Sequence, residues 1–232
     1  PDHRHDLEAM LAAIDDRTRV VILCTPNNPT GTAITTTEFE SFMARVPTHV
    51  LVILDEAYAE FSHDPEIVCG KKQKGRFANL VTLRTFSKAY GLAGLRIGYG
   101  IGHHAIFQAA TATAIPMVVT EQAQRAALAV LAHHDESMAV VHEICDRRDR
   151  VWTGLVEQGW DVPRPHGNFV WLPTGDNTDA AAAILEADGI IARVFVGEGV
   201  RVTVGEEESV PKLLASTARI VAANLHRPTS NG

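Results

Sequence analysis

The stretch that decides the fold of this chain reads TFSKAYGLAGLRIGYG and occupies residues 85–100. It follows the apolar run LVTL, residues 80–83, which predicts a buried strand. Lysine is rarely buried unless it is paired or chemically used, so Lys88 at the exit of this strand calls for an explanation. The glycines of the stretch allow the backbone to come close to a ligand or to another strand.

Two hydroxyls and a second cation accompany this lysine. Thr85 and Ser87 precede Lys88, and Arg96 follows it eight positions later. Hydroxyls donate hydrogen bonds and a guanidinium binds two oxygens at once, so this set suits a phosphate group. An amine beside a phosphate site is what a pyridoxal phosphate enzyme needs, because its lysine bonds covalently to the anchored aldehyde. Taken alone, the motif has an alternative explanation, which is a strand, a glycine-rich turn and solvent-exposed charges.

The composition is that of an ordinary globular protein. The 232 residues are 46% hydrophobic and 21% charged, with a net charge of −7. The acidic excess argues against a nucleic-acid or anionic-membrane surface, and no apolar run approaches the roughly 20 residues of a membrane span. Three widely separated cysteines favour a reducing cytoplasm over a disulfide framework. The histidine pairs at 103–104 and 133–134 lack the partners of a metal site, so we expect no metal.

Strands and helices alternate upstream of the lysine stretch. The apolar runs at 20–24 and 50–54 predict strands buried on both faces, as in a parallel sheet. The sequence TTTE at 35–38 caps a helix predicted from about 38 to 45. This alternation predicts an α/β fold, in which ligands bind beyond the carboxyl ends of the strands.

Polar side chains follow three of these predicted strand ends. Asn28, Asp55 and Lys88 each lie just past such an end, and we expect them to converge on one crevice. A pyridoxal ring needs a carboxylate at its pyridine nitrogen, for which Asp55 is the candidate. Its phenolic oxygen needs a hydrogen-bond donor, and both Asn28 and Tyr58 qualify.

A change in composition near 115–120 predicts a domain junction. We expect a large domain over residues 1–116 and a smaller α+β domain over residues 117–232. The smaller domain is expected to contain helices over 118–158, 180–187 and 211–225, strands over 169–172 and 199–205, and a frayed tail over 227–232.

Four motifs in this order resemble the fold-type I pyridoxal phosphate aminotransferases. They are NNPTG at 27–31, DEAY at 55–58, the lysine stretch over 85–98 and VRVTVG at 200–205. The resemblance is greatest to the histidinol-phosphate aminotransferase group, and within it to the aromatic (phenylalanine) aminotransferases. It implies part of a large domain with a mostly parallel sheet and helices, followed by a smaller α+β domain.

The resemblance also implies the roles of individual residues. Lys88 holds the cofactor and moves the proton between the substrate Cα and the cofactor C4′, with Asp55 and Tyr58 completing the catalytic set. Arg201 binds the substrate carboxylate or the phosphate of histidinol phosphate, and Asn168 lies near the substrate, as does Asn28. The implied cofactor-binding residues are Asn28, Asp55, Tyr58, Thr85, Ser87, Lys88 and Arg96.

The implied activity is amino transfer between an aromatic amino acid or histidinol phosphate and 2-oxoglutarate. The full-length form is implied to be a cytoplasmic homodimer in amino-acid biosynthesis. Histidinol-phosphate enzymes often read Ile-Arg-Asp where this chain has ARV at 192–194, and the segment NFVW at 168–171 resembles the aromatic branch more. Two alternatives stay open: another pyridoxal reaction on the same fold, namely β-elimination or decarboxylation, or a truncated non-catalytic remnant.

The family has a long upstream portion that supplies a glycine- and serine-containing phosphate loop, a ring-stacking aromatic residue and an N-terminal arm. No glycine precedes Gly31 in this chain, so we expect this portion to be missing. We predict that the 232-residue chain alone binds the cofactor weakly and turns over poorly. Cofactor titration and steady-state rates of the purified chain measure this, and full activity would contradict it.

Overall fold

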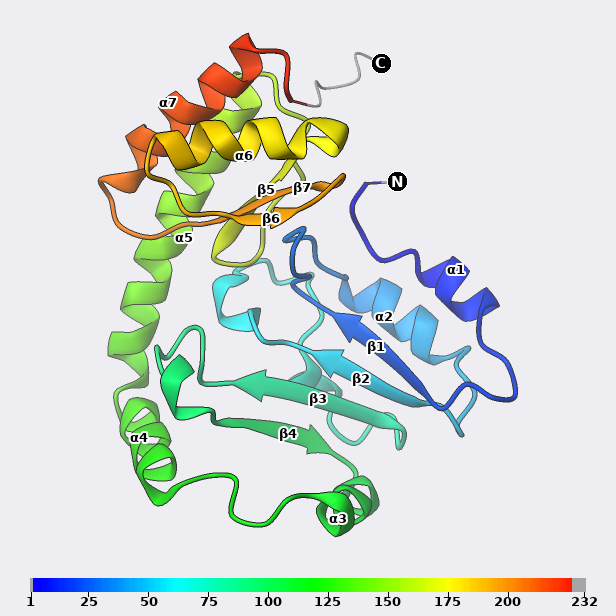
Figure 1. Cartoon of the computed structure of the whole chain (residues 1–232). Coiled ribbons are helices and arrows are strands. Elements are labelled where there is room, and N and C mark those ends of the chain that lie inside the picture. Colours follow the sequence, from blue (N-terminus) through cyan, green and yellow to red (C-terminus); the bar gives the residue numbers. More distant parts are fainter. Residues whose placement is uncertain (1, 227–232) are drawn as a thin grey trace. The chain divides into compact units, whose positions relative to one another are not determined.

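The computed structural model describes residues 2–226, so the tail predicted at 227–232 lies outside the described residues (Figure 1). Contacts between residues divide the chain into two compact units. The lysine unit, which contains Lys88, comprises Arg4–Pro26 and Ala33–Ala139. The arginine unit, which contains Arg201, comprises Asn27–Thr32 and the chain from Val140, with the N-terminal residues up to His3. The domain boundary at residues 116 and 117 stays a prediction.

The lysine unit is built on a four-stranded sheet with the order β1-β2-β3-β4 (Figure 1). The predicted strands are confirmed as β1 (Val20–Cys24), β2 (Leu51–Asp55) and β3 (Leu80–Thr85), and they are mutually parallel. The fourth strand, β4 (Gly98–Gly102), pairs with β3 in the antiparallel sense. The carboxyl ends of the three parallel strands therefore lie at the same edge of the sheet.

One face of this sheet packs against α2 (Thr36–Met43), and α1 (Leu7–Ala12) contacts α2. Leu23, Val52 and Leu54 on the sheet are fully buried, and they pack with Phe39 and Phe42 of the helix. The helix begins at Thr36, two residues before the predicted start, and the predicted cap is present: the Thr35 hydroxyl accepts from the Glu38 backbone N–H, and the Glu38 carboxylate accepts from the Thr35 N–H.

The prediction that the strand at 20–24 is buried on both faces is wrong. Val20 is 46% exposed and Ile22 is 57% exposed, although both are large and apolar. β1 lies at the edge of the described sheet, and only its alternate side chains, Val21 and Leu23, pack into the core. A continuous apolar run in the sequence therefore does not distinguish an edge strand from a central strand.

The strand β4 was not predicted, because three of its five residues are glycines, which are depleted in strands, although Tyr99 and Ile101 favour one. A Cβ atom at Gly98 would lie 2.6 Å from the Arg84 carbonyl oxygen, so glycine at this position permits the close approach of β4 to β3. The lysine unit further contains three short 3₁₀ helices, η1 (Ala59–Phe61), η2 (Gly70–Gln73) and η3 (Ala93–Leu95), and the helices α3 (His104–Thr113) and α4 (Glu121–Ala132).

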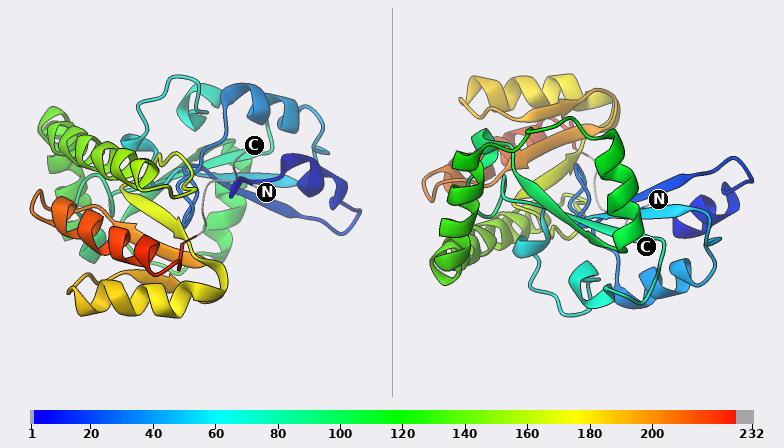
Figure 2. Two further views of the ribbon diagram at one scale, coloured as in Figure 1. Left: turned by 90° about the horizontal axis from the view of Figure 1, so that it is seen from above. Right: turned by 90° about the horizontal axis from the view of Figure 1, so that it is seen from below.

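The arginine unit has a three-stranded antiparallel sheet with the order β5-β7-β6. Its strands are β5 (Phe169–Pro173), β6 (Arg193–Phe195) and β7 (Gly199–Thr203). Figure 2 shows α6 and α7 running side by side next to this sheet. The remaining elements are α5 (His134–Glu157), which begins in the lysine unit, η4 (Gly175–Asn177), α6 (Thr178–Ala187) and α7 (Ser209–Ala222).

The core of the arginine unit lies between this sheet and its helices. Leu155 and Trp160 are fully buried together with Leu172 and Val200 of the sheet and Ile220 of α7. The helical sequence predicted over 118–158 forms two helices, α4 and α5. The short strand β6 was not predicted. Within residues 2–226, every helix is either too short or too polar to cross a membrane.

Replacement of Thr35 by alanine tests the capping box. Thr35→Ala removes the acceptor for the Glu38 N–H and should lower the free energy of unfolding by about 1 kcal/mol. Thr37→Ala is the matched control, since Thr37 is exposed in the same first turn and caps nothing, and it should change stability by less than about 0.5 kcal/mol. Urea unfolding followed by circular dichroism measures both, and equal effects of the two substitutions would contradict the capping argument.

Candidate functional site

Asp55, Tyr58 and Lys88 lie at or just beyond the ends of the neighbouring strands β2 and β3 in the lysine unit. Asp55 is the last residue of β2, and Thr85 is the last residue of β3. Lys88 is exposed, and its Nζ atom lies 5.4 Å from the centroid of the Tyr58 ring. Tyr58 itself is only 5% exposed. The amine and the phenol that the sequence predicts for one site are therefore neighbours.

The segment that carries Lys88 is held by backbone and aromatic contacts. The Phe86 N–H donates to the Ile97 carbonyl oxygen (3.1 Å), and the Ser87 N–H donates to the Thr85 hydroxyl (3.0 Å). The buried Phe86 ring packs between Tyr90 and Tyr99, with centroid distances of 5.3 and 5.7 Å. Phe86 anchors the turn in the protein, which leaves Lys88 in solvent.

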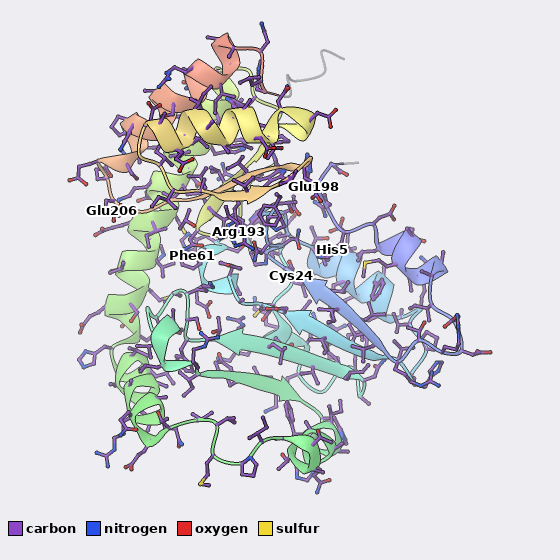
Figure 3. The ribbon with its side chains drawn as sticks, in the orientation of Figure 1. His5, Cys24, Phe61, Arg193, Glu198 and Glu206 are labelled. Carbon is purple, nitrogen blue, oxygen red and sulfur yellow. The ribbon has the colours of Figure 1, made fainter. Side chains whose placement is uncertain are left out.

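Asp55 is half-buried and partly satisfied by the backbone. Its Oδ1 atom accepts from the Ala57 N–H at 3.1 Å, and its carbonyl oxygen accepts from the Thr25 N–H at 2.9 Å. Its strand partner on β1 is Cys24, whose carbonyl oxygen lies 3.0 Å from the His5 Nε2 atom (Figure 3). His5 is therefore placed near the ends of β1 and β2, a position that the sequence pattern did not indicate.

Arg96, the predicted phosphate ligand, is turned toward its own backbone. It has a left-handed backbone conformation (φ 51°), and its Nη1 atom donates to the Ala93 carbonyl oxygen at 2.7 Å. Its side chain is exposed. Arg96 thus follows the lysine turn, as the motif predicts, with its guanidinium engaged locally.

A buried carboxylate, Glu56, and a half-buried guanidinium, Arg84, lie next to this set, and neither was predicted from the sequence. Glu56 is 0% exposed and its Oε2 atom accepts from Arg84 Nε at 2.7 Å. Burial raises the pKa of the Glu56 carboxyl, although Arg84 and the Gly70 N–H oppose this. Burial alone would lower the pKa of Arg84, but Glu56 and Glu60 raise it above its usual value. The sequence did contain a signal for both residues, because Glu56 directly follows Asp55 and Arg84 directly precedes Thr85, and Asp55 and Thr85 are predicted cofactor residues.

Arg201 and Asn28 are hydrogen-bonded in the arginine unit. The Arg201 Nη1 atom donates to Asn28 Oδ1 at 2.7 Å, and the guanidinium lies 5.1 Å from the centroid of the Phe169 ring. Arg201 Nε is buried and makes no hydrogen bond within residues 2–226. Arg201 alternates with the buried Val200 and Val202 along β7, as predicted. This guanidinium is oriented by an amide and an aromatic ring.

The loop that presents Asn28 depends on a glycine. The Gly31 N–H donates to the Asn27 carbonyl oxygen at 2.8 Å, and the Gly31 carbonyl accepts from the His166 N–H at 2.8 Å. Gly31 has φ +78°, and a Cβ atom there would lie 3.3 Å from Pro165 Cα. The NNPTG motif therefore folds as a tight turn against the segment that leads into β5.

The predicted site residues fall into two sets. Asn168 is half-buried in the arginine unit, where its carbonyl oxygen accepts from the Val204 N–H at 2.9 Å. Arg193 on β6 is exposed and stacks on Phe195 at 6.0 Å (Figure 3). The convergence of Asn28 with Asp55 and Lys88 stays a prediction. The lysine set is Asp55, Tyr58, Thr85, Ser87, Lys88 and Arg96, and the arginine set is Asn28, Asn168 and Arg201.

The histidine pairs do not build a metal centre in the part of the chain that the structure describes. Across residues 2–226, no three His, Cys, Asp or Glu side chains gather as metal ligands would. His133 instead contacts Glu136 one helical turn away, at 2.8 Å, and this hydrogen bond raises the pKa of its imidazole. The chemistry of the lysine set is that of an amine, a carboxylate, hydroxyls and a guanidinium.

Comparison with known proteins gives consistent results. A model of the family described as aminotransferase class I and II matches residues 1–225. An aromatic amino acid aminotransferase of Streptomyces avermitilis is 50% identical over 219 residues, which is 94% of this chain and 61% of that protein. An aromatic amino acid aminotransferase of Thermobifida fusca is 48% identical, over 88% of this chain and 57% of that protein. The chain spans about 60% of the length of these curated relatives.

The solved structures show the same fold. The histidinol-phosphate aminotransferase of Sinorhizobium meliloti, crystallised in complex with pyridoxal 5′-phosphate, superposes with a TM-score of 0.84. It is 28% identical in sequence, and the match covers 97% of this chain and 63% of that chain. The expected α/β fold class, with a large-domain sheet followed by a smaller α+β part, is confirmed. The chain belongs to the aminotransferase class I and II family.

Proposed function

We propose that this chain forms part of a pyridoxal phosphate-dependent aminotransferase that transfers an amino group between an aromatic amino acid and 2-oxoglutarate. The observation that carries the proposal is the lysine set: Lys88 Nζ lies over the Tyr58 ring beside the strand end that bears Asp55. Relatives at 48–50% identity that are named aromatic amino acid aminotransferases support the substrate class. The activity belongs to the whole protein, of which this chain matches about 60%.

The residues of the lysine set fit this cofactor chemically. The exposed Lys88 amine is available to an aldehyde, and the half-buried Asp55 carboxylate suits a protonated ring nitrogen. The hydroxyls of Thr85 and Ser87 are half-buried, and the open space beside Gly91 and Gly94 leaves room for an anion. When bound, pyridoxal phosphate supplies an electron sink that stabilises negative charge at the substrate Cα.

Each residue then has a role that follows from its chemistry. Lys88 holds the cofactor, removes the proton from the substrate Cα once its amine is free, and delivers a proton to the cofactor C4′. Asp55 keeps the ring nitrogen protonated, and Tyr58 donates to the phenolic oxygen. The phosphate is held by the hydroxyls of Thr85 and Ser87 and by Arg96, once Arg96 releases the Ala93 carbonyl.

The arginine set supplies the substrate site. A guanidinium binds both oxygens of a carboxylate, and Asn28 and Phe169 already restrict the orientation of Arg201. In this proposal, Asn28 also contacts the cofactor phenolic oxygen and Asn168 lies near the substrate. The rings of Trp171 and Phe195 make an edge-to-face contact, with centroids 5.5 Å apart, in the same sheet, and Trp171 is the strand partner of Arg201.

Histidinol phosphate is the second candidate donor. Solved histidinol-phosphate aminotransferases share the fold, at 28% identity for the Sinorhizobium meliloti enzyme. The higher identity to the aromatic enzymes favours an aromatic amino acid. Initial rates with phenylalanine, tyrosine and histidinol phosphate, each with 2-oxoglutarate, separate the two, and a preference for histidinol phosphate would overturn the aromatic assignment.

The assembly and the location are further parts of the proposal. The resemblance to the family supports a homodimer of the full-length form in amino-acid biosynthesis, and the three widely separated cysteines support a reducing cytoplasm. The proposed partners are small-molecule amino acids and 2-oxo acids. Sedimentation of the purified protein tests the dimer, and a monomer at micromolar concentration would contradict it.

Borohydride reduction tests the role of Lys88. After addition of pyridoxal phosphate and reduction, the label should appear on the peptide that contains Lys88, and Lys88→Ala should abolish the label on that peptide, because an alanine side chain has no amine to form the reducible bond. Lys72→Ala is the matched control, since Lys72 is also exposed in the lysine unit. Peptide mapping by mass spectrometry locates the label, and a wild-type label on another lysine would overturn the site assignment.

Calorimetry with 3-phenylpropionate, an amine-free analogue of phenylalanine, tests Arg201. Arg201→Met should weaken binding to the cofactor-loaded chain by roughly tenfold to a hundredfold, because a charged hydrogen-bonded pair with the carboxylate is lost. Asn28→Ala should weaken it less, since Asn28 orients the guanidinium. Arg125→Met on the exposed face of α4 is the control. Unchanged affinity for Arg201→Met would exclude Arg201 as the carboxylate ligand.

A further inference from the structure

The strand ends that carry the lysine set are joined by a buried ion pair. Glu56 directly follows Asp55 and is 0% exposed, whereas Asp55 is half-buried. Arg84 directly precedes Thr85, and its side chain is 14% exposed. Because successive side chains of an extended chain project to opposite sides, the pair lies on the side away from Asp55 and Thr85. Each member of the pair is thus adjacent in sequence to a residue of the lysine set.

Both members of the pair make further contacts within the lysine unit. Glu56 Oε1 accepts from the Gly70 N–H at 2.6 Å, and its Oε2 accepts from Arg84 Nε at 2.7 Å. Arg84 Nη1 donates to Glu60 Oε1 at 2.9 Å, and Arg84 Nη2 lies 3.9 Å from Cys69 Sγ. The guanidinium therefore bridges two carboxylates, one on each side of Tyr58 in the sequence. Its contacts hold the turn after β2 against β3.

The backbone alone does not require charged residues at these positions. The Glu56 N–H already donates to the Leu83 carbonyl oxygen at 3.0 Å, which continues the β2–β3 ladder. A buried ion pair often stabilises a fold no better than apolar residues of similar size, because both charges lose their hydration. What an ion pair with hydrogen bonds does supply is a fixed geometry, since the planar guanidinium accepts carboxylates only along defined directions.

We propose that Glu56 and Arg84 are positioning residues for the lysine set. Their ion pair fixes the end of β2, which carries Asp55, relative to the end of β3, which leads to Lys88. The inference rests on the proposed function in so far as Asp55 and Lys88 contact the same cofactor. The geometric part of the inference concerns the chain without the cofactor and can be tested separately.

Hydrogen exchange on the cofactor-free 232-residue chain is the first test. Glu56→Gln keeps the size of the side chain but removes its charge, so the peptides that cover residues 55–60 and 85–92 should exchange about tenfold faster. Arg84→Lys keeps the charge but cannot bridge two carboxylates, and it should have the same local effect. Phe42→Leu is the control, because Phe42 is a buried residue of α2 in the core of the same unit.

The cofactor provides the second readout. In the wild-type chain treated with pyridoxal phosphate, the pH midpoint of the visible absorbance depends on the groups that surround Lys88. Glu56→Gln and Arg84→Lys should shift this midpoint and weaken cofactor binding by about tenfold, since a displaced Asp55 no longer supports the ring nitrogen. Phe42→Leu should lower the melting temperature without moving the midpoint.

Hydrogen exchange and cofactor binding together distinguish the positioning role of the ion pair from the proposed function. If the wild-type chain takes no borohydride label at Lys88, the proposed function fails, while the exchange data still decide whether the pair positions the strand ends. The inference is overturned if both variants exchange like Phe42→Leu at residues 55–60 and 85–92. It is overturned equally if the cofactor binds with unchanged affinity and an unchanged absorbance midpoint in both variants. Should Arg84→Lys not fold, Glu60→Gln takes its place, because it removes the other carboxylate on the guanidinium.

Discussion

The burial of Glu56 against Arg84 is the constraint on which the geometry of the lysine unit depends. Removal of one partner from a buried ion pair typically costs about 3–5 kcal/mol, because the remaining charge is left without its counter-ion. Loss of either side chain of the pair should therefore lower the free energy of unfolding. The pair also couples the turn after β2 to the end of β3. Asp55 and Thr85 flank it directly, so any movement of the pair is transmitted to them through a single peptide bond.

The strands and the helix cap were predicted correctly where the local sequence pattern and the packing in the folded chain favour the same structure. The runs at 20–24, 50–54 and 80–83 became strands, and Thr35 with Glu38 formed the expected capping box. The sequence-based predictions failed where the position of a segment in the fold determines its burial or its strand pairing. The exposure of Val20 and Ile22 follows from the edge position of β1, and β4 forms from glycines because it pairs closely with β3. Neither edge position nor close pairing is encoded in hydrophobic periodicity.

In the candidate site, too, the sequence motifs indicated individual residues, whereas the contacts between them became visible only in the fold. The motifs identified Asp55, Tyr58 and Lys88, because the chemistry of the residue types and the strand ends were visible in the sequence. The hydrogen bond between Asn28 and Arg201 joins residues 173 positions apart, and only the fold reveals that Asn28 orients this guanidinium. Glu56 and Arg84 were missed because charged residues beside strand ends usually face solvent, and their mutual pairing cannot be deduced from spacing alone.

The two sets differ in how far they are organised before any ligand binds. Arg201 already donates to Asn28 and stacks on Phe169, so a substrate carboxylate would meet a guanidinium whose rotamer freedom is largely removed. Arg96 is exposed and donates to the Ala93 carbonyl oxygen, and Lys88 is exposed although its Nζ atom lies 5.4 Å from the Tyr58 ring centroid. A phosphate must therefore compete with a local hydrogen bond and order exposed side chains. Under the proposed function, this rearrangement would lower the affinity of the lysine unit for a phosphate, whereas the proposed positioning role of Glu56 would fix the geometry of Asp55 in advance.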